Sequence, residues 1–374
     1  MLKDNFYMMK AIKLAKIGIY TTTPNPNVGC VIVKNDKIIG TGYHFQTGKA
    51  HAEIYALKMA GINAKGSTVY ITLEPCNYNN NTPACCIALI KAQVHRVVIA
   101  TKDPNPKVNG QGLETLIKSG IKITHNILAK EAKKINHGFF QRMLYGVPYI
   151  TLKLASSLDG KIALCNGISK WISCKKSRQD VYKLRAQSSA ILSTSQTVIK
   201  DNATLIVHWH KLSKNIKSQY PKKYLRQPIR IILDRTNKIT PFHKIITIPE
   251  KIILIKSKYN INIWPKHVQQ IIVPLNKGYF DIKYLFKILG KMNINNILIE
   301  AGSILSGFLI LNNFINELII YMTPKLFGHN ALNLCNIKKI NNINNVLHFN
   351  FHKIKMISKD LKLILRPTKT QIWT

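Results

Sequence analysis

The sequence predicts an α/β protein built from two domains, and three observations support this. Its 374 residues are enough for two or three domains of ordinary size. Hydrophobic residues make up 46% of the chain, so each domain can bury a core and wholesale disorder is excluded. Strand-like and helix-like segments alternate over residues 1–146 and begin to alternate again at residue 147, which is typical of layered α/β folds.

The first domain is predicted over residues 1–146. It opens with an amphipathic helix over residues 1–18, because charged and apolar residues interleave there. A hairpin follows, with Val28–Lys34 and Lys37–His44 as strands and Asn35-Asp36 as the turn. Helices and strands then alternate through His51–Gly61, Thr68–Leu73, Pro83–Ala92, Arg96–Ala100, Gly112–Gly120 and Ile121–His125.

The second domain is predicted over residues 147–374, because the Gly-Val-Pro segment at 146–148 is typical of a break between domains. Its predicted strands are Tyr149–Ala155, Ser189–Leu192, Ile229–Leu233, Lys251–Ile255, Asn296–Glu300 and, as the last one, Glu317–Met322. Its predicted helices are Lys175–Gln187, Asp281–Met292 and Ile304–Leu311. Asn202–Leu225 and Ile261–Lys266 are predicted to be surface insertions.

The net charge and the number of cysteines do not identify a function by themselves. Lys plus Arg is 55 and Asp plus Glu is 16, and the net charge of +39 invites a nucleic-acid partner. The basic residues are spread over the whole chain, however, so phosphorylated metabolites suit the charge equally well. No secretory signal and no run of about 18 apolar residues appears, and the seven cysteines are an odd number. We therefore expect a cytoplasmic protein without a membrane partner, whose cysteines are thiols or metal ligands.

Three residues of the first domain have the character of zinc ligands. His51 begins a predicted helix, Cys76 follows a predicted strand, and Cys85 begins the next helix. One imidazole and two thiolates leave the fourth zinc position to water, whose pKa zinc lowers to about 7. Glu53, two residues after His51, can take a proton from that water and pass it to a leaving amine. This arrangement is typical of zinc deaminases, and the alternative is a coincidence of cysteines in an apolar core.

The spacing of the two cysteines departs from the usual pair. Eight residues separate Cys76 from Cys85, where two are usual, and Cys86 adjoins Cys85. We expect Cys85 to face the metal and Cys86 to face the core. The long connection leaves room for a substrate larger than a bare base. The role of Cys30 stays open.

The chain resembles the bifunctional deaminase–reductase family of riboflavin biosynthesis over nearly its full length. The motifs that carry the resemblance are Thr23–Val33, Gly42–His44, His51–Glu53, Thr72–Cys76, Thr82-Pro83, Cys85-Cys86, Asp103–Pro106, Leu154–Lys161, Leu184–Gln187 and Ile299–Gly302. The resemblance implies an N-terminal cytidine-deaminase-like α/β/α layer domain and a C-terminal dihydrofolate-reductase-like α/β domain. It also implies one Zn²⁺ per chain and NADPH as the reductant.

The resemblance further implies two reactions on a small phosphorylated pyrimidine. The first is hydrolytic deamination of 2,5-diamino-6-(5-phosphoribosylamino)pyrimidin-4-one. The second is reduction of the ribosyl group of 5-amino-6-(5-phosphoribosylamino)uracil to a ribityl chain. The substrate contacts carried over are Asn25, His44, Asp103, Asn105, Ser169, Arg185, Leu205, His208 and Glu300. The NADPH contacts carried over are Ala155, Trp171, Thr197, Asp201, Gly302, Ser303, Ile304, Leu305, Ser306, Gly307 and Phe308.

Some reductase residues also have a chemical rationale of their own. Ile299–Gly307 reads as a strand, a Gly-Ser turn and a helix start, whose backbone N–H groups can hold a diphosphate. Lys153 and Glu300 are candidates for positioning or protonating the ribose carbonyl during hydride transfer. Arg185 suits a phosphate through its planar fork, or it forms a structural ion pair with Glu300. Trp171 stacks beside the nicotinamide, or it is an ordinary half-buried core aromatic.

Several positions depart from the family pattern. The departures are Tyr78, Asn80 and Asn81 in the loop before Thr82, Ser193–Gln196 where a glycine precedes Thr197, and Ala203 and His208 in place of Pro and Arg. We expect a working deaminase with a raised KM, and weakened NADPH and substrate binding in the reductase. The alternative is a decaying deaminase domain.

Three other functions compete with this one. A tRNA or nucleic-acid deaminase would use the charge, but it needs a Cys-x-x-Cys pair and leaves the second domain without a role. A catalytically dead nucleic-acid-binding protein requires aromatic residues interleaved with basic ones on one face, and no such stripe is evident. An enzyme that retains one of the two activities is the third. A homo-oligomer is possible.

Overall fold

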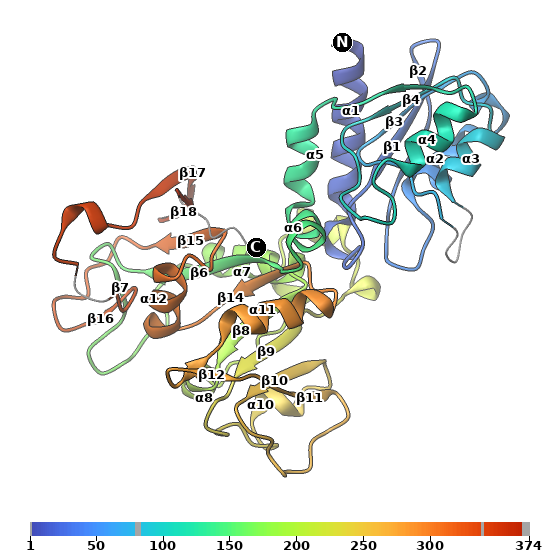
Figure 1. The fold of residues 1–374 in the computed structure, drawn as a ribbon. Helices are drawn as coiled ribbons and strands as arrows, with labels where there is room; N and C mark the ends of the chain where they lie inside the picture. The colour runs from blue at the N-terminus through green and yellow to red at the C-terminus, as the bar shows by residue number, and fades with distance from the viewer. Residues whose placement is uncertain (1, 79–83, 338–339, 369–374) are drawn as a thin grey trace. The chain divides into compact units, whose positions relative to one another are not determined.

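The computed structural model describes residues 2–78, 84–337 and 340–368 (Figure 1). The chain divides into two compact units, residues 1–146 and residues 147–374. Each unit has a sheet with helices on both faces, which confirms the predicted α/β class. The described residues contain no helix of the length and hydrophobicity that a membrane crossing requires.

A five-stranded sheet forms the centre of the first unit, in the order β2-β1-β3-β4-β5. Its strands are β1 Gly29–Lys34, β2 Lys37–Tyr43, β3 Thr68–Ile71, β4 Arg96–Ile99 and β5 Lys122–Thr124. β1 pairs antiparallel with both β2 and β3, and β3, β4 and β5 run parallel. The predicted turn between β1 and β2 is present, with positive φ angles of 48° at Asn35 and 60° at Asp36.

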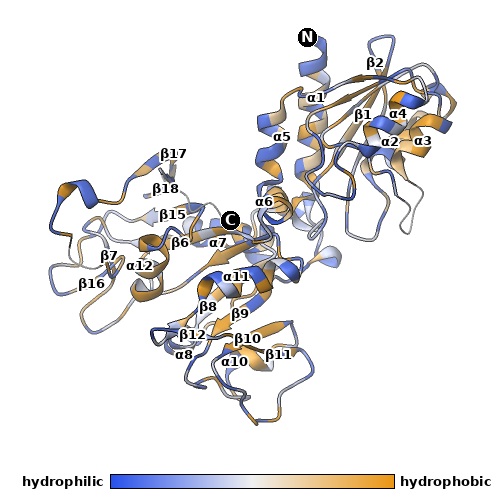
Figure 2. Ribbon diagram, in the orientation of Figure 1, coloured by the Kyte–Doolittle hydropathy of each residue, from blue (hydrophilic) through white to orange (hydrophobic). Residues whose placement is uncertain are grey.

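Helices cover both faces of this sheet. They are α1 Leu2–Ala15, α2 Ala52–Ala60, α3 Cys85–Lys91, α4 Gln111–Lys118, α5 Ala129–Ile135 and α6 His137–Tyr145. The alternation along β1 explains the layers, because Cys30 and Ile32 join one core cluster while Val31 and Val33 join another. Helices α5 and α6 were not among the predicted elements. Figure 2 shows the contrast between the hydrophobic strands and the mixed, amphipathic helices.

The second unit is built on a nine-stranded sheet in the order β11-β10-β9-β8-β14-β6-β15-β18-β17. Its strands are β6 Tyr149–Ser156, β8 Ala190–Thr194, β9 Ile229–Leu233, β10 Ile252–Lys256, β11 Val268–Ile272, β14 Asn296–Ile299, β15 Glu317–Met322, β17 Phe349–Ile357 and β18 Asp360–Pro367. The strands from β11 to β15 run parallel, and β18 and β17 add an antiparallel edge.

Shorter elements complete the second unit. Its helices are α7 Lys175–Gln187, α8 Ser195–Asp201, α9 Lys214–Gln219, α10 Lys244–Thr247, α11 Ile282–Lys291 and α12 Ser303–Leu311. Two small antiparallel sheets have two strands each. One is a hairpin of β12 Leu275–Asn276 and β13 Tyr279–Phe280, and the other pairs β16 Leu332–Asn333 with the distant β7 Lys161–Ala163.

Two predictions for this unit were wrong. Glu317–Met322 is not the last strand, because β17 and β18 follow it. β17 escaped prediction because all its interior residues are exposed, so its sequence has no buried face to reveal. The segment 202–225 is not purely a surface insertion either. Leu205, Val207, Leu212 and Tyr220 are buried there, and Leu205 packs into the core beside β9 and β10.

Candidate active sites

Helix packing places the three predicted zinc ligands of the first unit. His51 is the N-cap residue of α2, in an extended conformation. A Cβ on Gly42 of β2 would lie 2.1 Å from the Ala52 carbonyl oxygen, so only glycine allows the start of α2 to lie this close to the sheet. Cys76 follows β3, and Cys85 is the first residue of α3. Three different elements thus contribute one ligand each.

The ligand atoms of His51, Cys76 and Cys85 all lie within 4.8 Å of one another. His51 Nδ1 is 3.2 Å from Cys85 Sγ and 3.6 Å from Cys76 Sγ. Tetrahedral zinc with ordinary bond lengths holds such atoms roughly 3.6–3.8 Å apart. The cluster therefore has the dimensions of a zinc site, and Cys86 points instead into the core cluster that contains Cys30 and Ile32.

Glu53 lies beside this cluster, where it can accept a hydrogen bond from a water molecule that would be the fourth zinc ligand. The side chain is buried, and its Oε2 atom has no hydrogen-bond partner. Burial raises the pKa of the Glu53 carboxyl. A buried carboxylate oxygen without a partner needs a donor, and a water molecule bound to zinc held by His51, Cys76 and Cys85 would supply one. The residues present therefore fit zinc.

The side chains of Cys76 and Cys85 are hydrogen-bonded to each other. The Cys85 thiol hydrogen-bonds to Cys76, which lowers the pKa of Cys76 and raises that of Cys85. The backbone N–H of Cys85 also donates to Cys76 Sγ over 3.4 Å. The Cys76 sulfur raises the pKa of His51 by hydrogen bonding to it. The arrangement thus stabilises the thiolate of Cys76, the form in which a cysteine binds a metal, but not that of Cys85.

Asn25 and His44 lie next to the ligand His51. Asn25 Nδ2 is 3.2 Å from His44 Nε2, and His44 Nδ1 is 3.1 Å from the Ala50 carbonyl oxygen. The rings of His44 and His51 meet edge to face at 5.4 Å. Burial lowers the pKa of His44, so the ring is neutral and donates from Nδ1 to Ala50. Two predicted substrate contacts are therefore close to the metal cluster.

Asp103 and Asn105 lie on a loop after β4. Asp103 is buried and its Oδ1 accepts a hydrogen bond from the Asn105 N–H over 2.8 Å. Burial raises the pKa of Asp103 to about 7, and the charges of Glu74 and Cys76 add to the effect. The charge of the ligand Cys76 thus acts on Asp103. Tyr78 is half-buried, while Asn80 and Asn81 lie outside the described residues.

Sequence reasoning gave no role to Glu74, which the structure places in contact with this loop. Its carboxylate accepts hydrogen bonds from the N–H groups of Asp103 and Gly110. The signal available in the sequence was a glutamate directly before the Pro-Cys pair at the end of a strand. A carboxylate there is unlike the apolar residues that precede it in β3.

In the second unit, Lys153, Arg185 and Glu300 come together from β6, α7 and the end of β14. Arg185 donates from Nε to Glu300 Oε1 over 2.6 Å and from Nη2 to Oε2 over 3.1 Å. Lys153 Nζ lies 3.8 Å from Glu300 Oε2. Burial opposes ionisation of Glu300, but Arg185 and Lys153 hold its pKa below the usual value. Burial lowers the pKa of Lys153. The ion pair weighed above as an alternative is thus present, and it includes Lys153.

Three basic side chains, His208, His210 and Lys211, form a second group beside Tyr182 of α7, whose ring also contacts Arg185. His208 meets Tyr182 edge to face at 5.5 Å, and the His210 ring lies 5.5 Å from His208. Lys211 Nζ is 5.3 Å from the Tyr182 ring centre, as part of the same group. Burial first, and then the charges of Lys211 and His210, lower the pKa of His208. His210 and Lys211 had not been predicted.

The other predicted substrate contacts of this unit are more scattered. Leu205 is buried with a left-handed φ of 53°, and its neighbour Ile206 accepts a hydrogen bond from Arg185 over 3.2 Å. The backbone therefore connects Leu205 to the ion-pair group. Ser169 is half-buried in the connection after β7.

The predicted dinucleotide segment divides into two parts. Gly302 is the N-cap of α12, and a Cβ built on it meets nothing within 4 Å, so the backbone is open there. A Cβ on Gly307, in contrast, would lie 2.1 Å from the Asn336 carbonyl oxygen. Leu305 and Phe308 pack against the hydrophobic core. Ser303 and the exposed Ile304 are therefore the neighbours of Gly302 that a ligand can approach, whereas Ser306 is buried against the Gly302 carbonyl.

The remaining predicted NADPH contacts surround the same sheet end. Thr197 lies in the first turn of α8, where its N–H donates to Thr194 Oγ1 over 3.2 Å. Asp201 ends α8, and its carbonyl accepts from Lys170 over 3.2 Å. Ala155 is half-buried on β6. Trp171 is 65% exposed, so it is not a half-buried core aromatic, and the Arg178 guanidinium stacks 4.4 Å from its ring.

Fold and site together define a zinc-dependent deaminase joined to an α/β reductase. Residues 1–101 match the cytidine and deoxycytidylate deaminase zinc-binding region, and residues 148–363 match the RibD C-terminal domain. The riboflavin biosynthesis protein RibD of Buchnera aphidicola subsp. Baizongia pistaciae is 53% identical over 97% of this chain and 98% of its own. The chain belongs to the RibD family of bifunctional riboflavin biosynthesis enzymes.

Two solved structures resemble the whole chain. Acinetobacter baumannii RibD, form 1, shares 39% identity with a TM-score of 0.90, covering 98% of this chain and 99% of that one. A Thermotoga maritima diaminohydroxyphosphoribosylaminopyrimidine deaminase/5-amino-6-(5-phosphoribosylamino)uracil reductase shares 30% identity with a TM-score of 0.85 and the same coverage. The chain is a deaminase and a reductase that acts on small molecules, with zinc and NADPH as cofactors. These matches give the second unit a role and do not favour a nucleic-acid deaminase.

Proposed function

We propose that the first unit hydrolyses the 2-amino group of 2,5-diamino-6-(5-phosphoribosylamino)pyrimidin-4-one. The second unit then reduces the ribosyl group of 5-amino-6-(5-phosphoribosylamino)uracil to ribityl. The observation that carries the proposal is the cluster of His51, Cys76 and Cys85 beside the unpartnered, buried Glu53 oxygen. The activities printed for the Thermotoga maritima structure support the choice of substrates. The two roles divide at residues 146 and 147.

Deamination depends on Glu53 as a proton carrier. Held by His51, Cys76 and Cys85, zinc supplies an acidified water at neutral pH. Glu53 takes one proton from the attacking water and gives it to the ring nitrogen. It then takes the proton of the new hydroxyl group and gives it to the amine, which leaves as ammonia as the C–N bond breaks and the C=O bond forms. Asn25, His44, Asp103 and Asn105 bind the edges of the pyrimidine and ribose hydroxyls.

Reduction depends on Lys153 as an acid next to a fixed carboxylate. NADPH supplies the hydride, and the open backbone at Gly302 with the start of α12 binds its diphosphate. Hydride adds to C1′ as the bond between C1′ and the ribose ring oxygen breaks, and Lys153, whose pKa burial lowers, donates a proton to that oxygen, which becomes a hydroxyl group. Glu300 holds Lys153 in place and is itself fixed by both donor nitrogens of Arg185. Thr197, Asp201, Trp171 and Ala155 complete the cofactor site.

The basic side chains beside α7 bind the 5′-phosphate in the reductase. His208, His210 and Lys211 gather around Tyr182 with Arg185 beside them. Burial and then the charges of Lys211, His210 and Arg185 lower the pKa of His208, and a phosphate placed there would offset those positive charges. Ser169 and Leu205 lie on the connections that border this group.

Assembly and compartment also belong to the proposal. The protein works in the cytoplasm on small phosphorylated pyrimidines, and nucleic acid is not its partner. The edge strand β17 exposes Phe351, Ile354 and Met356 by 64%, 56% and 59%, so a second copy of the chain can pair with it. A dimer that persists in Met356→Lys and Ile354→Lys variants, measured by light scattering, contradicts pairing through this edge.

Mass analysis of products tests the two activities separately. The purified chain with zinc is incubated with the diamino substrate, with and without NADPH. Without NADPH, we expect one amine to be exchanged for oxygen. With NADPH, the product also gains two hydrogens. Reduction of the substrate before any exchange, or no reaction at all, contradicts the proposed sequence.

A further inference from the structure

Glu74 is a buried carboxylate of the deaminase unit that the proposed mechanism leaves unused. It lies between the end of β3 and the ligand Cys76, and it is 4% exposed. A buried carboxylate requires hydrogen-bond donors. The groups that donate hydrogen bonds to Glu74 therefore identify the segment of the chain that Glu74 holds in place.

Both ends of the loop 103–110 hydrogen-bond to this one carboxylate. Gly110 donates its N–H to Glu74 Oε1 over 2.8 Å and to Oε2 over 3.0 Å. Asp103 donates its N–H to Glu74 Oε2 over 3.2 Å. Gly110 is the N-cap of α4, so the carboxylate also lies where the helix dipole favours negative charge.

The start of α4 packs directly on the turn that contains Glu74. A Cβ on Gly112 would lie 2.2 Å from the Pro75 carbonyl oxygen, closer than any side chain permits. Asn77 Nδ2 donates to Gln111 Oε1 over 2.7 Å. The turn that carries the metal ligand and the loop that carries Asp103 are therefore joined by side-chain and backbone contacts on both sides of Cys76.

A role in folding alone explains this arrangement poorly. Glu74 lies close enough to Asp103 for its charge to act on that buried carboxyl. Two buried carboxyls near each other oppose folding, and a neutral cap would hold the loop without that cost. Asp103 in turn fixes Asn105, whose N–H donates to Asp103 Oδ1 over 2.8 Å. Glu74 is therefore the first member of a chain of contacts that ends at two proposed substrate contacts.

We propose that Glu74 is a positioning residue of the deaminase, which fixes Asp103 and Asn105 relative to the metal ligand Cys76. It acts through the loop and touches no substrate. The inference rests on the proposed deamination, because it assigns Glu74 to the binding of that substrate. It predicts an effect on substrate affinity that a general loss of stability does not produce.

The test compares Glu74→Gln with Glu114→Gln in the full-length chain. Glu114 is an exposed glutamate of α4, so it is a matched control on the same helix. In Glu74→Gln an NH₂ group replaces one acceptor oxygen and faces an N–H donor. We expect the KM for the diamino substrate to rise roughly tenfold or more, with a smaller change in kcat. Zinc content and the NADPH-dependent rate of the second unit, measured on the same molecules, should equal those of the wild type.

A second variant changes the contact between α4 and the turn that contains Glu74 by a substitution in α4. Gly112→Ala keeps the glutamate at position 74 but pushes α4 away from Pro75, with the new Cβ also in contact with Glu74 Oε1, and we expect the same selective rise in KM. An unchanged KM in Glu74→Gln overturns the inference, and so does a loss of zinc, since Glu74 would then support the metal turn instead. If the wild-type chain itself does not deaminate the substrate, the proposed function fails together with this inference. An unchanged KM beside an active wild type defeats the inference alone.

Discussion

At the scale of single residues, the surroundings of Glu53 distinguish it from the other acidic side chains. It is buried at the start of α2, with one carboxylate oxygen unpartnered and the three ligand residues nearby. Burial of an unpaired carboxyl is unfavourable for stability, and such groups are typical of catalytic sites. The same short motif would be uninformative on an exposed helix.

Removal of the Glu53 carboxylate should stop deamination without disturbing the metal. We expect Glu53→Gln to lower the deamination rate by about 10²–10⁴-fold, because the amide cannot carry the proton. Zinc content should be unchanged, since His51, Cys76 and Cys85 remain. Product analysis and metal analysis on the same sample measure both, and Glu131→Gln on exposed α5 is the matched control. A variant that deaminates at the wild-type rate would remove Glu53 from the mechanism.

Protonation of His208 should control the affinity of the reductase for its phosphorylated substrate. Burial and the neighbouring cations hold the pKa of His208 below 6.5, so the free imidazole is neutral at pH 7. A phosphate favours the imidazolium, so binding takes up a proton. The KM should therefore be lowest in acid and should rise as the pH increases through neutrality.

The substitution His208→Arg isolates this effect. The guanidinium is charged at every pH in the range, so we expect a lower KM at about pH 8 and a flatter pH dependence. Ionisation of the substrate phosphate is the same for both proteins, so the difference between their curves belongs to residue 208. His329→Arg on the exposed surface is the control. Parallel KM curves for wild type and His208→Arg would exclude a phosphate contact at this position.

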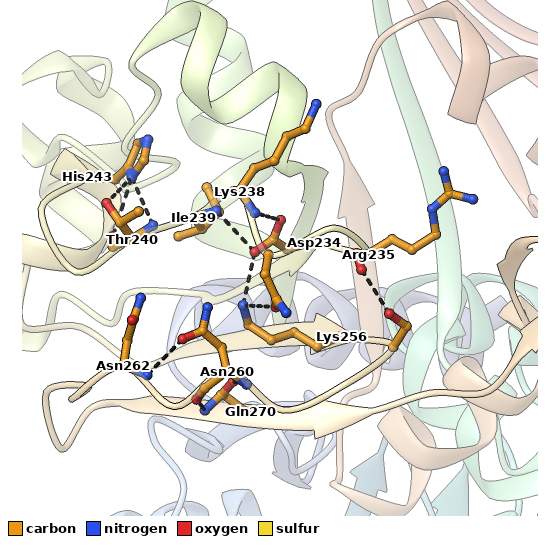
Figure 3. A network of polar contacts seen from close by, with 12 residues as sticks. Asp234, Arg235, Lys238, Ile239, Thr240, His243, Lys256, Asn260, Asn262 and Gln270 are labelled. Atoms are coloured by element: carbon orange, nitrogen blue, oxygen red, sulfur yellow. Dashed lines mark hydrogen bonds and ion pairs between the residues drawn. The ribbon is translucent and has the colours of Figure 1, made fainter.

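At the scale of secondary-structure elements, the ends of β9 and β10 are joined by a fully buried ion pair (Figure 3). Lys256 Nζ lies 3.1 Å from Asp234 Oδ2 and donates to Asn237 Oδ1 over 2.6 Å. Asp234 also accepts from the N–H groups of Lys238 and Ile239. The pair fixes the connection that leaves β9, at the carboxyl edge where parallel sheets bind ligands.

Breaking this pair from one side should destabilise the second unit. Lys256→Met leaves Asp234 buried without its counter-charge, and we expect a loss of about 3–5 kcal/mol of unfolding free energy. All four tryptophans of the chain lie after residue 147, so their fluorescence during urea unfolding reports on this unit. Lys258→Met on the exposed surface is the control, and adding Asp234→Asn should restore part of the loss. Equal midpoints for Lys256→Met and Lys258→Met would contradict a structural role for the pair.

The antiparallel strand β17, at the edge of the second sheet, could not be predicted from its own sequence, whereas other elements of that unit could. Strands β9 and β15 occupy the predicted ranges because each is a short apolar run that the sheet buries on both faces, and the charge-rich helix α7 also occupies its predicted range. β17 has no such period, since it is exposed along its length and is held by pairing with β18. Strand pairing between distant segments leaves little local signal in either one.

At the scale of the whole molecule, two units with separate sheets carry two kinds of chemistry in one chain. The His51, Cys76 and Cys85 cluster is the one group of potential metal ligands within the ranges that the structure describes. The second unit has instead an open helix start and a group of basic side chains. The basic residues that give the net charge of +39 are distributed over both units, so the charge does not distinguish the chemistry of one unit from that of the other.

Metal removal should therefore separate the two activities. Dialysis against a zinc chelator should abolish deamination and leave NADPH-dependent reduction of the deaminated substrate unchanged. Added zinc should restore deamination, because its ligands come from folded elements that remain in place. Loss of both activities on chelation would show that the second unit also depends on the metal.

The sequence by itself determined the α/β class, the family and the metal chemistry. Those properties depend on local periodicity and on His51, Cys76, Cys85 and Glu53 within short motifs. Tertiary structure decided which neighbours share a site. It placed Gly307 against Asn336 rather than in an open cradle, and it brought Glu74 to the ends of a distant loop. Close approaches between segments far apart in the chain arise from packing, and packing has no period along the sequence.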